Sequence, residues 1–222
     1  MFLTKSLIEN VKKKKLFVFD FDGVVLDSVD VKGEVFYQIY ESYGKGVASA
    51  AKLYHLKNGG VPRNKKFEHL HSKLLNYQLC DEELSLLSRQ FSRLAFQKLE
   101  CADEIPGIRM FLDYLKSDTK LCTINSAAPA DDLAQILTRR NLIEYFGGIF
   151  GSEESKIENL RVMQKKFDFL PGDIIFFGDT KNDKDAAEAV GIDFISVRSN
   201  DLGCSLGGNS HKTSLHDFRE LL

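Results

Sequence analysis

Four short polar groups each follow an apolar or glycine-containing stretch, and together they hold several acids, a hydroxyl and a lysine. They are Asp20 and Asp22 after residues 16–19, Ser126 after residues 121–124, Lys156 shortly after Gly151, and Asp179 with Asp183 after residues 174–177. Parallel strands bring their carboxyl ends to one edge of a sheet, where ligands bind in open α/β folds. We therefore expect these side chains to converge at one edge.

Asp20 and Asp22 place two carboxylates close together directly after the first apolar run. Two carboxylates that stand two residues apart in extended chain point the same way, and they repel each other unless a cation or a shared proton relieves them. Gly23 follows and lets the backbone turn sharply. The alternative is that one aspartate caps a helix while the other is solvated. The D-x-D pattern by itself leaves both interpretations open.

The other three groups favour chemistry when all four are considered together. Clustered carboxylates offer the oxygen ligands that suit Mg²⁺. A lysine and a serine, with backbone N–H groups, suit the outer oxygens of a phosphate. A further aspartate can then act as a nucleophile that forms an aspartyl-phosphate. Taken singly, each group has a plainer interpretation: Ser126 as a helix N-cap, Lys156 as a solvated lysine, and the two later aspartates as helix caps.

Two kinds of sequence pattern must position these residues. Short apolar runs alternate with helical periodicity over most of the chain, which predicts an α/β domain built on a parallel sheet. The predicted strands are 16–19, 121–124, 148–150, 173–177 and 194–197. Helices are predicted between them at 107–117, 129–140, 155–167 and 182–190. Residues 29–103 show helical patterns alone, so we expect an all-helical block that interrupts the α/β domain after its first strand.

Several local features carry expectations of their own. We expect the lysine run 12–15 to be a solvated lead-in to the first strand. Asp81 is predicted to cap a helix that reaches about residue 100, and Pro129 to occupy the first turn of its helix. A glycine-rich loop at 203–208 is predicted to precede a final helix over 214–222.

Composition limits the classes of protein that this chain can represent. Its 222 residues are 43% hydrophobic, and 30 basic against 32 acidic residues give a net charge of −2. This balance gives no support for a nucleic-acid or membrane surface. No run approaches the roughly 20 apolar residues of a membrane span, and no signal peptide is apparent. The four cysteines lack metal-type spacing. We expect a cytoplasmic protein that is a monomer by default.

Together the four groups resemble the motifs of the haloacid dehalogenase superfamily of phosphohydrolases, over nearly the whole chain. The stretch Asp20-Phe21-Asp22-Gly23-Val24-Val25 is similar to the first motif, Ser126 to the second and Lys156 to the third. Gly178-Asp179-Thr180-Lys181-Asn182-Asp183 is similar to the acidic fourth motif. The resemblance implies a three-layer, Rossmann-like α/β core over 1–28 and 104–222. It also implies a small all-helical cap, of the type placed between the first two motifs, over 29–103.

The resemblance also implies roles for individual residues. Asp20 would be the nucleophile and Asp22 the general acid and base, while Ser126 and Lys156 would hold the phosphate. Mg²⁺ would be bound by Asp20, the backbone carbonyl of Asp22 and Asp179, with Asp183 in or next to its outer shell. In the cap, Arg63, Lys66 and His55 would be candidates for gripping the leaving group, although ordinary helix-surface residues are the favoured interpretation of Lys66 and His55.

The implied activity is Mg²⁺-dependent hydrolysis of a small phosphorylated metabolite, such as a phosphosugar. A phosphosugar mutase would use the same core residues and stays open as an alternative. Asp22 and Asp179 argue against a haloacid dehalogenase, which needs neither, and Asp22 also argues against a phosphonate hydrolase. A catalytically silent binding scaffold is the alternative from a different class, which the intact acidic residues and Lys156 disfavour.

Overall fold

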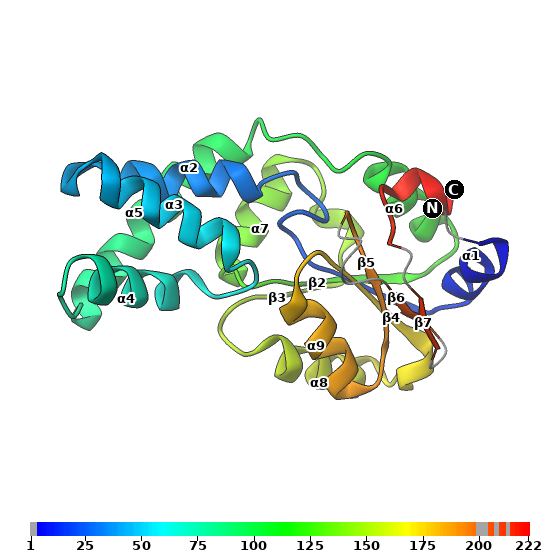
Figure 1. Cartoon of the computed structure of the whole chain (residues 1–222). Helices are drawn as coiled ribbons and strands as arrows, with labels where there is room; N and C mark the ends of the chain where they lie inside the picture. Colours follow the sequence, from blue (N-terminus) through cyan, green and yellow to red (C-terminus); the bar gives the residue numbers. More distant parts are fainter. Residues whose placement is uncertain (1–3, 199–203, 207–208, 212–213) are drawn as a thin grey trace. The chain divides into compact units, whose positions relative to one another are not determined.

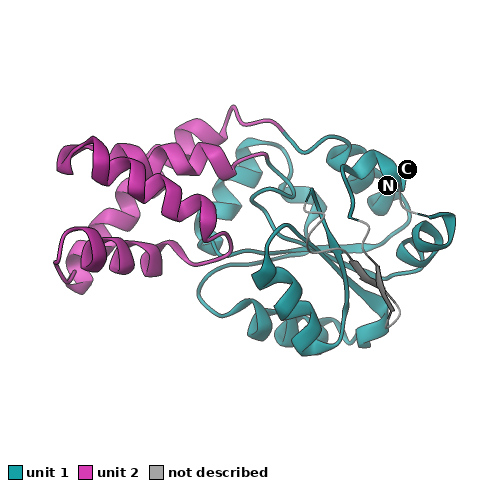
Figure 2. Ribbon diagram, in the orientation of Figure 1, with its two compact units in different colours: residues 1–26, 104–222 teal, residues 27–103 magenta. Residues whose placement is uncertain are grey.

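The chain forms two compact units, each described here by itself. The structure is a computed structural model that describes residues 4–198, 204–206, 209–211 and 214–222. Unit 1 comprises residues 1–26 and 104–222, and unit 2 comprises residues 27–103 (Figure 2). The first boundary falls after Leu26, whereas the predicted domain boundary was placed after Ser28.

Unit 1 is built on one seven-stranded sheet with the order β3-β2-β1-β4-β5-β6-β7 (Figure 1). Its strands are β1 (Leu16–Phe19), β2 (Leu121–Asn125), β3 (Gly148–Phe150), β4 (Ile174–Gly178), β5 (Asp193–Ser196), β6 (Cys204–Leu206) and β7 (Asn209–His211). The first five strands pair in parallel, and β6 and β7 are antiparallel. The five predicted strands and the α/β fold class are therefore confirmed.

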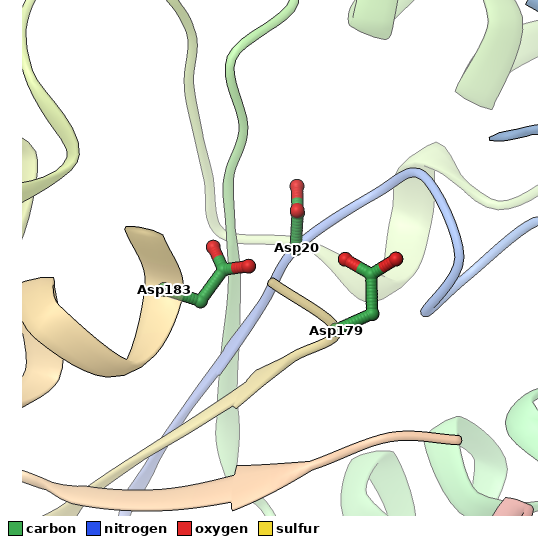
Figure 3. Close-up of side chains that lie close together, drawn as sticks. All are labelled: Asp20, Asp179 and Asp183. Atoms are coloured by element: carbon green, nitrogen blue, oxygen red, sulfur yellow. The ribbon is translucent and has the colours of Figure 1, made fainter. Parts of the chain in front are cut away.

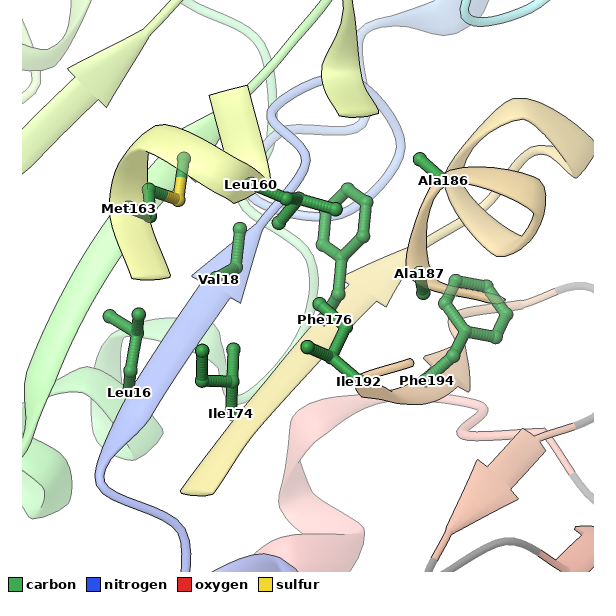
Figure 4. Packing of buried hydrophobic residues seen from close by; sticks show 10 residues of the cluster. All are labelled: Leu16, Val18, Leu160, Met163, Ile174, Phe176, Ala186, Ala187, Ile192 and Phe194. Atoms are coloured by element: carbon green, nitrogen blue, oxygen red, sulfur yellow. The ribbon is translucent and has the colours of Figure 1, made fainter. Parts of the chain in front are cut away.

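Strand β1 lies at the centre of the parallel part because both of its faces are apolar. Leu16 and Val18 belong to a buried cluster with Ile174 and Phe176 of β4 and with residues of two helices (Figure 4). These helices are α8 (Lys156–Phe167) and α9 (Lys181–Val190). Alternate side chains of a strand point to opposite faces of the sheet, so this cluster forms one of the two layers that cover β1.

The opposite face of β1 carries an aromatic cluster. The rings of Phe17 and Phe19 contact Phe177 of β4, with centroids 6.4 and 5.1 Å apart. Phe111 of α6 (Ile108–Ser117) packs 6.4 Å from Phe19, and Phe218 packs 5.6 Å from Phe111. Helix α7 (Ala130–Arg139) is confirmed as well, so the four helices predicted between the strands are all present. The sheet thus has packed layers on both faces, as the three-layer expectation requires.

Unit 2 is helical throughout, and its core is aromatic. Its elements are α2 (Val29–Tyr40), the 3-10 turn Glu41–Tyr43, α3 (Lys45–Lys57), α4 (Arg63–Leu74) and α5 (Asp81–Leu99). Phe36 of α2 lies 5.3 Å from the ring of Phe67 and 5.0 Å from that of Phe91. Helix α5 begins after Cys80, whose N–H donates to Glu83 Oε2 at 2.9 Å, so the predicted cap at Asp81 was one residue late.

The two chain segments at the boundary of the units pair with each other. Leu26 and Glu104 form an antiparallel bridge. Ile105 N–H donates to Val25 O at 3.0 Å, and Asp27 N–H donates to Asp103 O at 2.8 Å. The segment that enters unit 2 and the segment that leaves it therefore run side by side.

The expectations for the lysine run and for Pro129 were wrong. Helix α1 (Lys5–Lys12) precedes β1, and Lys14 is 6% exposed with its Nζ 2.5 Å from Asp193 Oδ2, so the lysine run is not a simple solvated lead-in. Pro129 is the N-cap of α7 and not its first residue.

The predicted helix over 214–222 is a single 3-10 turn, Phe218–Leu221. Leu215 N–H donates to Ser196 O at 2.8 Å, which holds residue 215 in extended chain beside β5. The loop expected at 203–208 is occupied in part by β6, and its residues 203, 207 and 208 lie outside the described part. None of the described helices is both long and apolar enough to span a bilayer.

Candidate active site

Asp20 follows β1, the strand that lies between β2 and β4. Its N–H donates to Phe177 O at 2.8 Å, so the ladder with β4 continues through Asp20 itself. The side chain is buried. Its Oδ1 accepts the N–H of Phe21 at 2.7 Å, and its Oδ2 lies 2.8 Å from Nζ of Lys156. Both carboxylate oxygens of Asp20 are therefore held in fixed directions.

Lys156 is the first residue of α8, and Ser155 caps that helix by accepting the N–H of Glu158 at 3.2 Å. The lysine side chain is nearly buried and forms ion pairs with both Asp20 and Asp183. A solvated surface lysine, the plainer interpretation, is thereby contradicted. Since the three groups come from β1, α8 and α9, the lysine joins three elements at the carboxyl edge of the sheet.

Asp179 and Asp183 come from the turn after β4 and from the first turn of α9. Thr180 caps α9, and its N–H and its Oγ1 both donate to Asp183 Oδ2, at 3.0 and 2.5 Å. Gly178 leaves room for this arrangement, because a Cβ at that position would lie 2.3 Å from the Cβ of Asp183. The capping interpretation of Asp183 is thus correct, and the same carboxylate also pairs with Lys156.

The carboxylates of Asp20, Asp179 and Asp183 gather at one place (Figure 3). One oxygen from each lies within 4.8 Å of the other two. Burial raises the pKa of Asp179 to about 8, helped by the charges of Asp20 and Asp183. Burial likewise raises the pKa of Asp20 to about 6, although the Lys156 charge opposes this rise. Burial lowers the pKa of Lys156, but Asp183 and Asp20 outweigh it and the net shift is upward.

These residues fit a divalent cation. Three carboxylates against one lysine leave two uncompensated negative charges when all are ionised. Asp179 Oδ1 is buried and has no hydrogen-bond partner, an arrangement that normally costs free energy. Carboxylate oxygens are the ligands that Mg²⁺ prefers. The donor set and the orphaned oxygen together make a consistent cation site.

Ser126 and Asp22 lie at the same edge of the sheet without joining this carboxylate group. Ser126 follows β2, which pairs with β1, and its Oγ accepts the N–H of Ala128 at 3.3 Å. The helix after it is capped by Pro129, so Ser126 is not its N-cap. Asp22 is partly buried in the loop that Gly23, with φ of 76°, closes by donating to Leu26 O at 2.8 Å.

The three candidate residues of the helical insert lie in unit 2. Lys66 and His55 are 4% and 8% exposed, and Lys66 Nζ lies 3.0 Å from His55 Nδ1. His55 Nε2 lies 3.2 Å from Val29 O, so a lysine donating to Nδ1 leaves Nε2 as the donor to that carbonyl. The interpretation of both as ordinary surface residues was wrong. Arg63 is partly exposed, with its guanidinium 5.5 Å from the centre of the Phe91 ring.

Sequence reasoning missed Thr180, Asn125 and Asn159. Thr180 and Asp183 have the spacing of a capping box, so that signal was present in the sequence. Asn125 and Asn159 donate hydrogen bonds between β2, α8 and the loop after β3. A polar residue at the end of an apolar strand was the only sign of the first, and no pattern indicated the second.

Comparisons with known proteins indicate the family of this chain. A model of the haloacid dehalogenase-like hydrolase family matches residues 17–197. A phosphorylated carbohydrates phosphatase from Thermotoga maritima is 25% identical over 183 residues, which cover 80% of this chain and 82% of that protein. A phosphoglycolate phosphatase from Pseudomonas savastanoi is 23% identical and covers 84% of this chain and 70% of its own.

Solved structures share the fold at lower identity. A protein from Haemophilus somnus, provisionally named phosphoglycolate phosphatase, matches with a TM-score of 0.72 at 18% identity, over 94% of this chain and 96% of its own. A hydrolase of the same superfamily from Geobacter sulfurreducens matches with a TM-score of 0.64 at 17% identity, over 94% and 95%. The family model spans most of the chain, from β1 to the residue after β5, and this chain therefore belongs to the haloacid dehalogenase-like hydrolases.

Proposed function

We propose that this hydrolase is a Mg²⁺-dependent phosphatase that acts on a small phosphorylated metabolite through an aspartyl-phosphate. The observation that carries the proposal is the buried cluster of Asp20, Asp179 and Asp183 around Lys156 at the carboxyl edge of the sheet. A carboxylate nucleophile, a fixed cation and a cation site are the groups that phosphoryl transfer needs in one place.

Asp20 is the proposed nucleophile. One of its oxygens attacks phosphorus and the bond from phosphorus to the leaving oxygen breaks, so the phosphoryl group moves to Asp20. The attack requires an ionised carboxylate, and Lys156 at 2.8 Å favours ionisation against the effect of burial. The bond from Phe21 N–H fixes the carboxylate so that little reorganisation precedes attack.

Asp22 is the proposed proton carrier. It gives its proton to the leaving oxygen in the first step. In the second step it takes a proton from the water that attacks the aspartyl-phosphate, which restores free Asp20 and releases phosphate. Ser126 and Lys156 are proposed to hold the outer phosphate oxygens, with Lys156 offsetting the charge that develops on them.

Asp20, Asp179 and the backbone carbonyl of Asp22 are the proposed ligands of Mg²⁺, with Asp183 next to them. When bound, Mg²⁺ supplies positive charge that stabilises the phosphoryl oxygens in the transition state. Both oxygens of Asp183 already have partners in Thr180 and Lys156, which suits a residue that orients others more than a direct ligand.

A phosphorylated carbohydrate or a comparably small phosphorylated acid is the proposed substrate class. The names of the two relatives, a phosphatase of phosphorylated carbohydrates and one of phosphoglycolate, support this class. Arg63, Lys66 and His55 of unit 2 are proposed to recognise the leaving group. Of the three, Arg63 has the most exposed side chain and is the best candidate for direct contact.

The test is a rate screen over some tens of phosphorylated metabolites, with Mg²⁺ and with chelator. We expect hydrolysis that chelator abolishes and that Asp20→Asn removes without loss of fold. Asp131→Asn, which neutralises an exposed aspartate in the first turn of α7, is the matched control and should keep full activity. Wild-type rates in the Asp20→Asn variant would refute the assignment of the nucleophile.

The best substrate then tests unit 2 and the competing functions. Arg63→Ala should lower kcat/KM, while Arg89→Ala, which removes an exposed arginine from α5, should not. Equal values for both variants would exclude Arg63 from recognition. Turnover of a sugar phosphate to its isomer, stimulated by a sugar bisphosphate, would instead identify a mutase. Absence of any Mg²⁺-dependent turnover would favour a binding scaffold.

A further inference from the structure

We infer that Asn125 and Asn159 are positioning residues that lock the phosphate-holding groups Ser126 and Lys156 to each other. The inference rests on the proposed phosphatase function and adds two residues that carry none of the proposed chemical steps. Its basis is a buried chain of amide hydrogen bonds. Asn159 Nδ2 donates to Asn125 Oδ1 at 3.0 Å, and Asn125 Nδ2 donates to Lys156 O at 3.0 Å.

The chain of bonds joins three segments that carry or flank the site. Asn125 is the last residue of β2 and directly precedes Ser126. Asn159 lies three residues after Lys156, so the two occupy neighbouring positions on one face of α8. Asn159 Nδ2 also donates to Gly151 O at 2.9 Å, which ties in the start of the loop between β3 and α8. The ends of β2 and β3 and the first turn of α8 are thus connected through side-chain amides.

The orientation of both amides is determined by their neighbours. Asn159 Nδ2 faces two oxygens, those of Asn125 and Gly151, so a flipped amide would place oxygen against oxygen. Asn125 Nδ2 faces the carbonyl of Lys156, and a flip there would have the same fault. Both residues are buried, at 0% and 5% exposure, so water cannot substitute freely for a lost partner. The network therefore has one arrangement and resists displacement.

Backbone hydrogen bonds between the same segments add to the side-chain network. Ser126 N–H donates to Phe150 O at 3.0 Å, and Ser152 N–H donates to Ala128 O at 3.0 Å. These bonds hold the segment after β2 against the segment after β3. Among these contacts, the one from Asn125 reaches the backbone of Lys156, and Asn159 holds Asn125 in place through its Oδ1. Without them the first turn of α8 could shift relative to Ser126, and displacements of about 1 Å can lower catalytic rates by about 100-fold.

The test compares Asn125→Ala and Asn159→Ala with wild type by three measurements on the folded protein. These are kcat on the best substrate, the inhibition constant of orthovanadate as a phosphate mimic, and the Mg²⁺ concentration that gives half-maximal rate. We expect kcat to fall about 10- to 100-fold and the vanadate constant to rise, because Ser126 and Lys156 lose their relative position. The Mg²⁺ requirement should not change, since Asp20 and Asp179 are untouched.

Thr123→Val is the matched control. Thr123 is also buried on β2, and its hydroxyl contacts Sδ of Met163 on α8 at 3.5 Å, so the variant removes a polar contact between the same two elements. It should lower stability while leaving kcat and vanadate binding near wild type. Equal losses of kcat in the control and the asparagine variants would overturn the inference, because they would show a general effect of β2–α8 packing.

Two further outcomes separate this inference from the proposed function. If the wild type has no Mg²⁺-dependent phosphatase activity, the proposed function fails and the inference fails with it. If wild type is active and both asparagine variants match it, only the inference is overturned. Should Asn125→Ala not fold, Asn125→Asp keeps the size and the bond from Asn159 but sets a carboxylate oxygen against Lys156 O. For this variant too we expect a lower kcat and a higher vanadate constant, and wild-type values of both would overturn the inference.

Discussion

Replacing Asp179 by asparagine should stabilise the metal-free protein. The variant removes one of three carboxylates that meet within 4.8 Å, and it keeps the size of the side chain. In chelator, Lys156 is the cation that the structure pairs with this group, through Asp20 and Asp183. The same substitution removes a proposed Mg²⁺ ligand, so it should also abolish the stabilisation that added Mg²⁺ provides. The variant is therefore expected to be the more stable protein without metal and to lose that advantage with metal.

The size of the effect follows from the geometry. Two unit charges at 4.8 Å repel by about 3 kcal/mol in an effective dielectric of about 20. Asp179 has two such neighbours, Asp20 and Asp183, and attraction to Lys156 cancels roughly one of them, which leaves a relief of about 3 kcal/mol. For a chain of this size that corresponds to a rise in Tm of roughly 6–12 °C.

The raised pKa of Asp179 gives the effect a pH dependence with a definite sign. Below the ordinary carboxyl value of 3.8 the folded and unfolded states are both protonated, and the wild type has no penalty. The penalty grows as pH rises from that value toward about 8, the pKa of Asp179 in the folded protein. The advantage of Asp179→Asn in chelator should therefore be larger at pH 7.5 than at pH 5.

Scanning calorimetry in chelator and in excess Mg²⁺ measures both effects. Saturating metal at about 100 times its dissociation constant should stabilise wild type by about 2.7 kcal/mol and the variant by little. Asp131→Asn controls for the loss of one negative charge and should follow wild type in both conditions. If Asp179→Asn melts below wild type in chelator, or if Mg²⁺ stabilises both proteins equally, the cation site has been misassigned.

Three further outcomes can be checked with the same protein. Lys156→Met leaves two buried carboxylates without their ion-pair partner. We therefore expect the unfolding free energy from urea titration to fall by about 3–5 kcal/mol, and the rate of phosphate release to fall at least about 100-fold. Wild-type stability in this variant would contradict the buried ion pairs. Burial lowers the pKa of His71, so the unfolded state binds the proton more readily, and the stability of unit 2 should decrease as pH falls below 6.5; His71→Gln should flatten this dependence in urea titrations at pH 7.5 and 5.5. Burial raises the pKa of Cys122 to about 12, so Ellman's reagent should modify the exposed Cys80 and Cys101 in the native protein and reach Cys122 only on unfolding; rapid native labelling of Cys122 would show that β2 opens.

The candidate site at the carboxyl edge of the sheet was predictable because its signals are local and consistent with one another. The runs 16–19 and 174–177 are apolar at every position, which suits a strand covered on both faces and little else. Their carboxyl ends are marked by Asp20 and Asp179, and parallel pairing then brings the two acids together. The sequence alone therefore predicts that these residues meet.

Other features depend on contacts between distant residues, which sequence patterns do not register. Lys66 has a spacing typical of a helix surface, yet its ammonium lies 5.9 Å from the centre of the Phe36 ring and beside His55, so the whole residue is buried. Leu215 is drawn into an extended bridge with Val197, which shortens the expected final helix to one turn. In both cases a partner far along the chain outweighs local preference.

The pairing of the two segments at the boundary of the units affects which insertions and deletions the protein can tolerate. The bridge between Leu26 and Glu104 brings the two ends of the insert together. For the chain of unit 1, the insert is therefore a connection between two adjacent points, like the loop of a hairpin. The entropy of closing such a loop rises only slowly with its length. A helical unit of another size, or a short turn, could therefore replace residues 27–103 without changing the register of β1. The fold thus allows the insert to diverge while the carboxyl edge of the sheet in unit 1 stays the same.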